Sequence, residues 1–413
     1  MSTHYTVAVV GAGMVGLSTA WFLQQRGAEV TVFDKTGPAA GASWGNAGWI
    51  TPTLSTPLPE PSTLTHGIRQ LLRPTSPLYV PLSVDPDLIG FLARFTRNST
   101  SRRWRSGMKK LVGINGQALD AFDILTNGGV EGPIHDADPF IVAYTDPAQA
   151  QTLLDEGCKI AATGQHVEIE RVSVEDARAM APLLSMNIRG ALLLRGQRYL
   201  HPPAFVAALA DSFVARGGLL RSSAKVTAVH DHGPRVSVVG DDLDVDFDSV
   251  VLANGAELNP LARPFGVRAQ VRAGRGYSFS VEPERMPEGP LYFPTSSVVC
   301  TPLGDRIRVA GMMEFRPHDA PLDPRRIEAI VESVRPLLRG VELDDRRDEW
   351  VGSRPCTADG LPLIGRTNSP RVFVAGGHGM EGMTLGPATG RLLAEAICTR
   401  TIPKDIAAFD PLR

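Results

Sequence analysis

The sequence predicts an α/β protein with a Rossmann-like nucleotide-binding domain and a second, discontinuous α+β domain built on a mainly antiparallel sheet. Three observations support this prediction. A glycine-rich turn joins a buried strand to a helix near the N-terminus, alternating strand patterns occur within 219–256 and 276–355, and a strand, a glycine loop and a helix close the chain. The length of 413 residues also favours more than one hydrophobic core.

The glycine-rich turn follows the apolar run Val7–Val10, which is typical of a buried parallel strand. Gly11, Gly13 and Gly16 form the motif G-x-G-x-x-G. The first glycine permits a tight turn, the second lets the backbone approach a pyrophosphate, and the third allows the helix to pack closely on the strand. The predicted helix, which ends at Gly27, presents free N–H groups and a positive dipole end to phosphates.

The next strand, Glu29–Phe33, ends at Asp34, whose carboxylate is placed to accept hydrogen bonds from a ribose diol. A carboxylate there disfavours the 2′-phosphate of NADP. The motif alone fits either NAD or FAD. The small-residue stretch "GPAAGASWGNAGWI" (37–50) favours a bulky ring system lying against backbone, and the lack of a second G-x-G-x-x-G disfavours a reductase with two nucleotide sites.

The domain boundaries follow changes of pattern along the chain. A proline-rich stretch, 52–86, marks the departure from the nucleotide-binding domain, and the apolar strand in "SVVLANGA" (249–256) marks a return to it. We expect the nucleotide-binding (FAD-binding) domain to comprise 1–51, 146–256 and 353–413, and the substrate-binding domain to comprise 52–145 and 257–352.

Composition excludes several functional classes. A formal net charge of −2 argues against a nucleic-acid binder. No apolar run is long enough to cross a bilayer, and the N-terminus shows no signal peptide, so we expect a cytoplasmic protein. The basic segment "RFTRNSTSRRWRSGMKK" (94–110) leaves a peripheral contact with the inner face of the membrane open. The four cysteines and nine histidines lack metal-ligand spacing, so we expect no metal site.

Six motifs, in the same order along nearly the whole chain, carry a family resemblance. They are "VVGAGMVGLSTAWFL", "ASWGNAGWI", "RGYSFSV", "DRIRVAGMMEF", "GSRPCTADGLPLIGRT" and "GGHGMEGMTLGPATGRLLAEAI". With these motifs the chain resembles the D-amino-acid oxidase superfamily of FAD-dependent oxidoreductases. It looks most like the bacterial D-amino-acid dehydrogenases, with glycine oxidase and sarcosine oxidase as more distant relatives.

The resemblance implies a noncovalent FAD. Its diphosphate would lie on Gly11–Val15, its ribose on Asp34, its adenine beside Val226, and its ring system along 43–50 with the pyrimidine side at 377–384. The cofactor-binding residues implied in this way are Gly11, Ala12, Gly13, Met14, Val15, Gly16, Asp34, Lys35, Ser43, Asn46, Ala47, Gly48, Ile50, Val226, Ala253, Asn254, Gly255, Gly377, Gly379, Met380, Gly382, Met383 and Thr384.

The resemblance also implies that Arg354 grips a substrate carboxylate. A guanidinium offers the planar fork that suits this role, and Pro355 would stiffen its backbone. The alternative is a structural salt bridge to Glu349 or Asp359. Tyr277 is a second candidate for the carboxylate, or else an ordinary strand tyrosine. His378 is a candidate acid–base or flavin-contacting group, or else a packing residue.

The expected reaction is oxidative deamination of a D-amino acid by hydride transfer from Cα to flavin N5. The imino acid formed would hydrolyse to a keto acid and ammonia. The expected partners are the amino-acid substrate and an electron acceptor, which is oxygen, a quinone or another carrier. An oxidase or dehydrogenase of an N-substituted glycine or cyclic secondary amino acid would share every motif, and a non-catalytic flavoprotein is a third hypothesis. Glu381 and Met383 depart from the dehydrogenase pattern and leave the substrate open.

Overall fold

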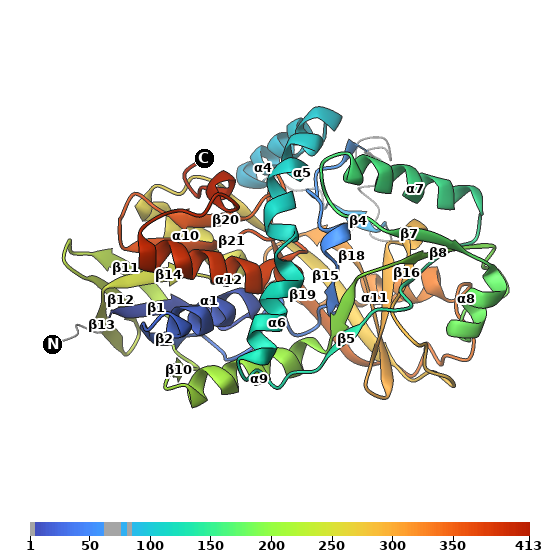
Figure 1. Ribbon diagram of the computed structural model, residues 1–413, viewed down its shortest axis with the longest axis horizontal. Helices are drawn as coiled ribbons and strands as arrows, with labels where there is room; N and C mark the ends of the chain where they lie inside the picture. The colour runs from blue at the N-terminus through green and yellow to red at the C-terminus, as the bar shows by residue number, and fades with distance from the viewer. Residues whose placement is uncertain (1–4, 62–75, 81–84) are drawn as a thin grey trace.

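The computed structural model describes residues 5–61, 76–80 and 85–413. Two large sheets organise the molecule, and Figure 1 shows them in its two halves. The half that contains both chain termini holds a six-stranded sheet, and the other half holds a nine-stranded sheet.

The six-stranded sheet is the predicted Rossmann-like unit. In spatial order its strands are β10 (Leu219–Arg221), β2 (Glu29–Phe33), β1 (Thr6–Val10), β14 (Ser249–Leu252), β21 (Val372–Gly376) and β20 (Leu363–Arg366). All neighbours are parallel except β20 and β21. Val9 pairs with Val32 and Val251, and all three side chains are buried, as expected for a parallel sheet covered on both faces.

Two helices from opposite ends of the chain pack side by side against this sheet (Figure 1). They are α1 (Met14–Gln25) and α12 (Gly382–Thr399). A Cβ on Gly390 would lie 2.6 Å from the backbone nitrogen of Thr19, so only glycine permits this approach. Helices α6 (Ala118–Asn127) and α9 (Pro202–Ala215) add apolar side chains to the same core.

The nine-stranded sheet forms the second domain. Its strands are β19 (Arg347–Thr357), β15 (Val271–Val281), β18 (Arg306–Phe315), β17 (Val298–Leu303), β16 (Leu291–Phe293), β6 (Ile141–Tyr144), β8 (Gly190–Leu194) and β7 (Ile169–Val172), with β4 (Leu78–Tyr79) beside β18. Its pairs are antiparallel except β16 with β6 and β18 with β4, which confirms the predicted mainly antiparallel sheet. Helix α11 (Pro324–Val334) buries its apolar side against it.

Smaller elements complete the fold. Two three-stranded sheets occur, β11 (Val226–Asp231) with β12 (Val236–Gly240) and β13 (Leu243–Phe247), and β3 (Trp49–Ile50) with β9 (Arg198–Leu200) and β5 (Ile134–Asp136). Among the described residues, the remaining α-helices are α4 (Pro86–Asn98), α5 (Ser101–Asn115), α7 (Ala148–Ala161), α8 (Val174–Met180) and α10 (Leu258–Ala262). Within the described part of the chain, no helix has the length and apolar character needed to span a membrane.

The sheet pairing differs from the predicted domain division at more than one place. Strand β5, from the predicted substrate-binding segment 52–145, pairs with β9, from the predicted nucleotide-binding segment 146–256. Strands β7 and β8 belong to the nine-stranded sheet, although the sequence analysis assigned 146–256 to the nucleotide-binding domain. The sequence of a short strand does not indicate which sheet it joins, and here β8 pairs with β6 although a long segment separates them in the chain. Of the predicted substrate-domain segment 52–145, residues 62–75 and 81–84 lie outside the described residues.

Candidate functional site

A cavity of about 370 Å³ lies at the carboxyl ends of β1 and β14, where an open α/β sheet binds its ligands. Segments from both domains line it, including the end of β19. The predicted cofactor residues on its wall are Gly11, Gly13, Met14, Val15, Asp34, Lys35, Ser43, Asn46, Val226, Ala253, Asn254, Gly255, Gly379, Met380, Gly382 and Met383.

Two helix N-termini reach this cavity, those of α1 and α12. Neither has a hydrogen bond from the side chain of its N-cap residue, which is Gly13 in α1 and Glu381 in α12. Exposed N–H groups and the positive dipole ends therefore face the same space from two directions, which suits a ligand with phosphate and other electron-rich groups.

The glycine turn at α1 is shaped for close backbone approach. Gly11 has φ +111°, and a Cβ there would lie 2.5 Å from the carbonyl oxygen of Ala253. The Ser43 hydroxyl accepts a hydrogen bond from the Met14 N–H at 3.3 Å and so joins the 37–50 segment to the helix N-terminus. The turn and the small-residue loop thus form one wall, as the sequence analysis expected.

Asp34 has a second role that the motif did not reveal. Its Oδ2 accepts the Ala12 N–H at 2.8 Å, and its Oδ1 accepts the N–H groups of Thr36 and Gly37 at 2.8 and 2.9 Å. The carboxylate therefore ties the glycine turn to the end of β2. Oδ1 uses both of its lone pairs in these bonds, whereas Oδ2 uses one, so Oδ2 can still accept a hydrogen bond from a ribose.

Several predicted cofactor residues lie behind the wall rather than on it. The Thr384 hydroxyl donates to the Trp49 carbonyl oxygen at 3.2 Å and accepts the Thr51 N–H at 3.4 Å, so it is bonded within the protein. The residues outside the cavity lining are Ala12, Gly16, Ala47, Gly48, Ile50, Gly377 and Thr384. They do not line the cavity, and their predicted contact with the cofactor stays a prediction.

The cavity has the features that FAD requires. Besides the glycine cradle and the helix N-termini, the buried Asn254 Oδ1 on the wall has no hydrogen-bond partner among the described residues. Buried polar atoms without partners are rare in folded proteins, and a bound polar ligand would satisfy this one. The residues present therefore fit the predicted cofactor.

Arg354 reaches the cavity from β19 by crossing the neighbouring strand. Its guanidinium lies over Gly276 of β15, where a Cβ would come within 2.2 Å of Cζ. Its Nη1 donates to the Met312 carbonyl oxygen of β18 at 2.7 Å. Burial lowers the pKa of Arg354 from its usual value, yet an arginine in a protein keeps its proton.

A β-bulge supplies the acceptor for Arg354. Residues 312 and 313 of β18 together oppose Gly276, and Met312 has φ +58°, a conformation that non-glycine residues seldom adopt. The bulge turns the Met312 carbonyl oxygen toward the guanidinium. The proposed salt bridges of Arg354 are not formed, because Glu349 pairs with Arg346 and Asp359 with Arg413.

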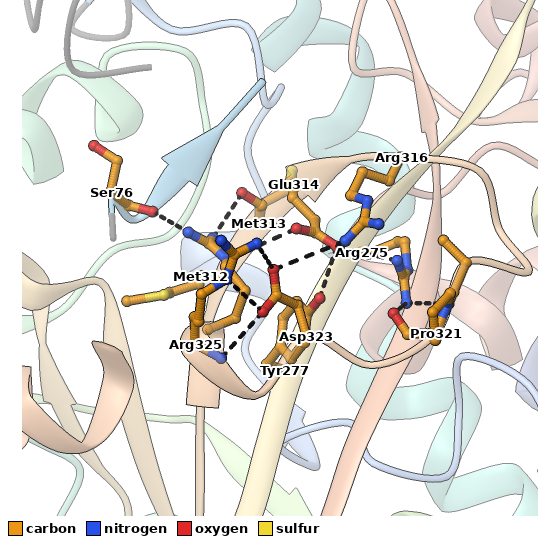
Figure 2. A network of polar contacts seen from close by, with 12 residues as sticks. Ser76, Arg275, Tyr277, Met312, Met313, Glu314, Arg316, Pro321, Asp323 and Arg325 are labelled. Carbon is orange, nitrogen blue, oxygen red and sulfur yellow. Dashed lines mark hydrogen bonds and ion pairs between the residues drawn. The ribbon is translucent and has the colours of Figure 1, made fainter. Parts of the chain in front are cut away.

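A buried polar network lies behind the bulge, as Figure 2 shows. Glu314, fully buried, faces Arg275 at 3.1 Å and Arg316 and Arg326 at 3.9 Å. Arg326 also donates to the Met313 carbonyl oxygen at 3.2 Å. The network thus holds both sides of the bulge on which Arg354 rests.

The structure does not place Tyr277 at the cavity, contrary to its predicted catalytic role. Its hydroxyl donates to Glu314 Oε1 at 2.7 Å inside the network, and its ring packs in the core of the second domain (Figure 2). Burial, together with Glu314, raises its pKa above the usual range. Strand residues alternate between faces, and the bulge places this tyrosine on the inner one.

His378 lines the cavity, but its imidazole is bonded within the protein. Its Nε2 lies 2.9 Å from the Thr389 Oγ1 of α12, and the residue is buried. Burial lowers its pKa to about 4. The ring is therefore neutral at physiological pH and fixes the glycine loop to α12, which favours the packing alternative over acid–base chemistry.

Sequence reasoning missed two residues of the site. The Trp350 ring lies on the cavity wall against the backbone of Gly45 and Gly352, and no local motif indicates it. Glu381, which departs from the dehydrogenase pattern, interacts electrostatically with Arg354 and accepts a hydrogen bond from the Ser55 hydroxyl at 2.5 Å. Its departure from the dehydrogenase pattern was the sequence signal that could have identified it.

Comparisons with known proteins agree with this arrangement. Residues 6–396 match the model of a family described as FAD dependent oxidoreductase. The chain is 30% identical over 417 aligned positions to a D-amino acid dehydrogenase of Allorhizobium ampelinum, covering 97% of this chain and 96% of that protein.

Solved structures show the same fold at lower identity. Glycine oxidase from Geobacillus kaustophilus has a TM-score of 0.75 at 20% identity and covers 99% of both chains. Iminodiacetate oxidase from Chelativorans sp. BNC1 has a TM-score of 0.73 at 19% identity and covers 98% of both.

Proposed function

The chain belongs to the family of FAD-dependent oxidoreductases, as its motifs predicted, and on that premise we propose that it oxidatively deaminates a D-amino acid whose carboxylate is held by Arg354. It is an FAD-dependent enzyme that acts on amino acids or amines. The D-amino acid dehydrogenase relative supports the finer assignment of substrate.

The position of Arg354 carries this proposal. It is a partly buried cation on the wall of the cofactor cavity, and no carboxylate of the described residues lies within ion-pair distance of it. A buried charge without a partner is costly, and a substrate carboxylate would compensate it. The hydrogen bond to Met312 uses one N–H group and leaves other N–H groups of the fork for that purpose.

The mechanism follows from how this chain holds the substrate. Arg354 binds and orients the carboxylate, while the bulge at Met312 and the glycine at 276 fix the position of the guanidinium. Bound FAD supplies the acceptor for the hydride that leaves Cα.

The test is an anaerobic substrate screen. The purified protein is mixed without oxygen with D-, L- and N-alkyl amino acids, and loss of the oxidised flavin spectrum is followed. We expect D-amino acids to reduce the flavin fastest. Faster reduction by an N-alkylglycine would assign the enzyme to secondary amines, and a flavin that no amino acid reduces would contradict the proposal.

A further inference from the structure

Glu381 is a partly buried carboxylate beside the cavity, and the proposed clamp does not use it. It is the N-cap residue of α12 and stands between Met380 and Gly382, which both line the cavity. Among the described residues, no cation lies within ion-pair distance of its carboxylate. Its carboxylate accepts a hydrogen bond from the Ser55 hydroxyl at 2.5 Å.

Arg354 and Glu381 act on one another across the site. Each appears among the charges that shift the pKa of the other, yet the two side chains do not form an ion pair. Two opposite charges in a buried site, close enough to interact and too far apart to pair, match a ligand that carries both charges. An α-amino acid in its zwitterionic form is such a ligand, because it compensates each charge at the opposite end.

Ser55 gives Glu381 a place for a proton. The Ser55 hydroxyl has a single hydrogen and two acceptors in reach, Glu381 Oε2 at 2.5 Å and the Thr51 carbonyl oxygen at 3.3 Å. When Glu381 is ionised, the hydroxyl donates to it. When Glu381 is protonated, the hydroxyl can turn to Thr51 and accept from Glu381, so both protonation states are hydrogen-bonded.

We propose, on the basis of the function proposed above, that Glu381 binds the substrate ammonium opposite Arg354 and takes the proton that this group must lose before Cα is oxidised. An N–H bond of the ammonium breaks and an O–H bond on Glu381 forms, which leaves the electron pair on nitrogen. That pair would assist departure of the hydride from Cα, for which bound FAD would supply the acceptor. The chain thereby supplies both ends of the substrate site.

The electrostatic surroundings agree with this role. Burial raises the pKa of Glu381 to about 7, while Ser55 and Arg354 act to lower it. A group whose pKa lies near the working pH exchanges protons readily in both directions. A carboxylate with a purely structural role would not need a pKa near the working pH.

The test measures ligand binding rather than turnover. The ligands are the α-methyl form of the amino acid that the wild-type enzyme oxidises fastest, which lacks a Cα–H, and the same acid without its amino group. For a D-alanine-oxidising enzyme these are 2-aminoisobutyrate and isobutyrate. Dissociation constants are measured by calorimetry on the FAD-bound wild type, Glu381→Gln, Ser55→Ala and, as a matched control, Glu349→Gln, whose carboxylate pairs with Arg346.

We expect the wild type and Glu349→Gln to bind the amino ligand at least tenfold more tightly than the desamino acid, because a charged hydrogen bond contributes on the order of tenfold or more. In Glu381→Gln this preference should fall below threefold, with the affinity for the desamino acid unchanged. Ser55→Ala should lie between. An undiminished preference in Glu381→Gln would overturn the inference and leave the proposed function standing. If no amino acid is oxidised and the wild type binds neither ligand, both the inference about Glu381 and the proposed function fail.

Discussion

Replacing Arg354 removes the group on which the proposed substrate site depends. In Arg354→Ala the substrate carboxylate would enter a buried site without its cation. Breaking a buried charged pair costs about 3–5 kcal/mol, which corresponds to a loss of roughly two to four decades in kcat/KM. Arg354→Lys keeps the charge but loses the planar fork, so its loss should be intermediate.

The structure offers a second way to perturb the same side chain. A Cβ at position 276 would lie 2.2 Å from Cζ of Arg354, so Gly276→Ala should displace the guanidinium while leaving its charge in place. We expect the kcat/KM of Gly276→Ala to fall by an intermediate amount, similar to that of Arg354→Lys. Arg413→Lys, in which the altered residue pairs with Asp359 away from the cavity, serves as the control and should be unaffected.

The assay is kcat/KM for the best amino acid, with FAD content measured in every variant. FAD should stay bound, because we expect the glycine turn and α12, rather than Arg354, to hold it. An alanine variant with full FAD and near-normal kcat/KM would refute the clamp.

Four further outcomes are expected. Asp34→Ala should weaken FAD binding by about 1–3 kcal/mol, measured by flavin fluorescence titration, and should lower the melting temperature of the apoprotein, because three backbone N–H groups lose their acceptor. The wild type should lose up to about 3 kcal/mol of stability as pH falls from 6.5 toward 4, because His378 stays neutral in the folded protein and is protonated in the unfolded chain. His378→Gln should lack this loss when denaturation is measured as a function of pH. Equal pH profiles for the two proteins would contradict a neutral, buried His378. The pKa of Glu381 is higher in the folded than in the unfolded chain, so this group lowers the stability of the fold as pH rises from 4.5 through 7. Glu381→Gln should therefore raise the melting temperature more at pH 8 than at pH 5, which corresponds to a gain in stability of up to about 3 kcal/mol. Glu314→Gln should cost about 3–5 kcal/mol by denaturant titration, because Arg275 loses a buried ionic partner, and an unchanged midpoint would show that the network tolerates the loss.

The nucleotide-binding half was largely predictable, because its signals are local. The apolar run, the glycine spacing and Asp34 lie within one βαβ unit, and β1, α1 and β2 follow the predicted ranges within a residue or two. The closing strand, glycine loop and helix were predicted for the same reason, and the structure brings them to the same cavity.

The second domain was less predictable, because its chemistry depends on strand register. Nothing in "RGYSFSV" or "DRIRVAGMMEF" indicates that 312 and 313 form a bulge opposite Gly276. That bulge turns Tyr277 toward Glu314 and the Met312 carbonyl oxygen toward Arg354, so one unpaired residue decides both outcomes. The membership of β7 and β8 in the nine-stranded sheet is a long-range pairing of the same kind.

The most direct measurement of the central claim compares an amino acid with its matching amine in anaerobic flavin reduction by the wild-type enzyme. The two differ by the carboxylate that Arg354 is proposed to hold. We predict rapid reduction by the D-amino acid and reduction at least a hundredfold slower by the amine, since about 3 kcal/mol of binding would be missing. Equal rates for the two, or an amine that reduces the flavin faster, would contradict the account.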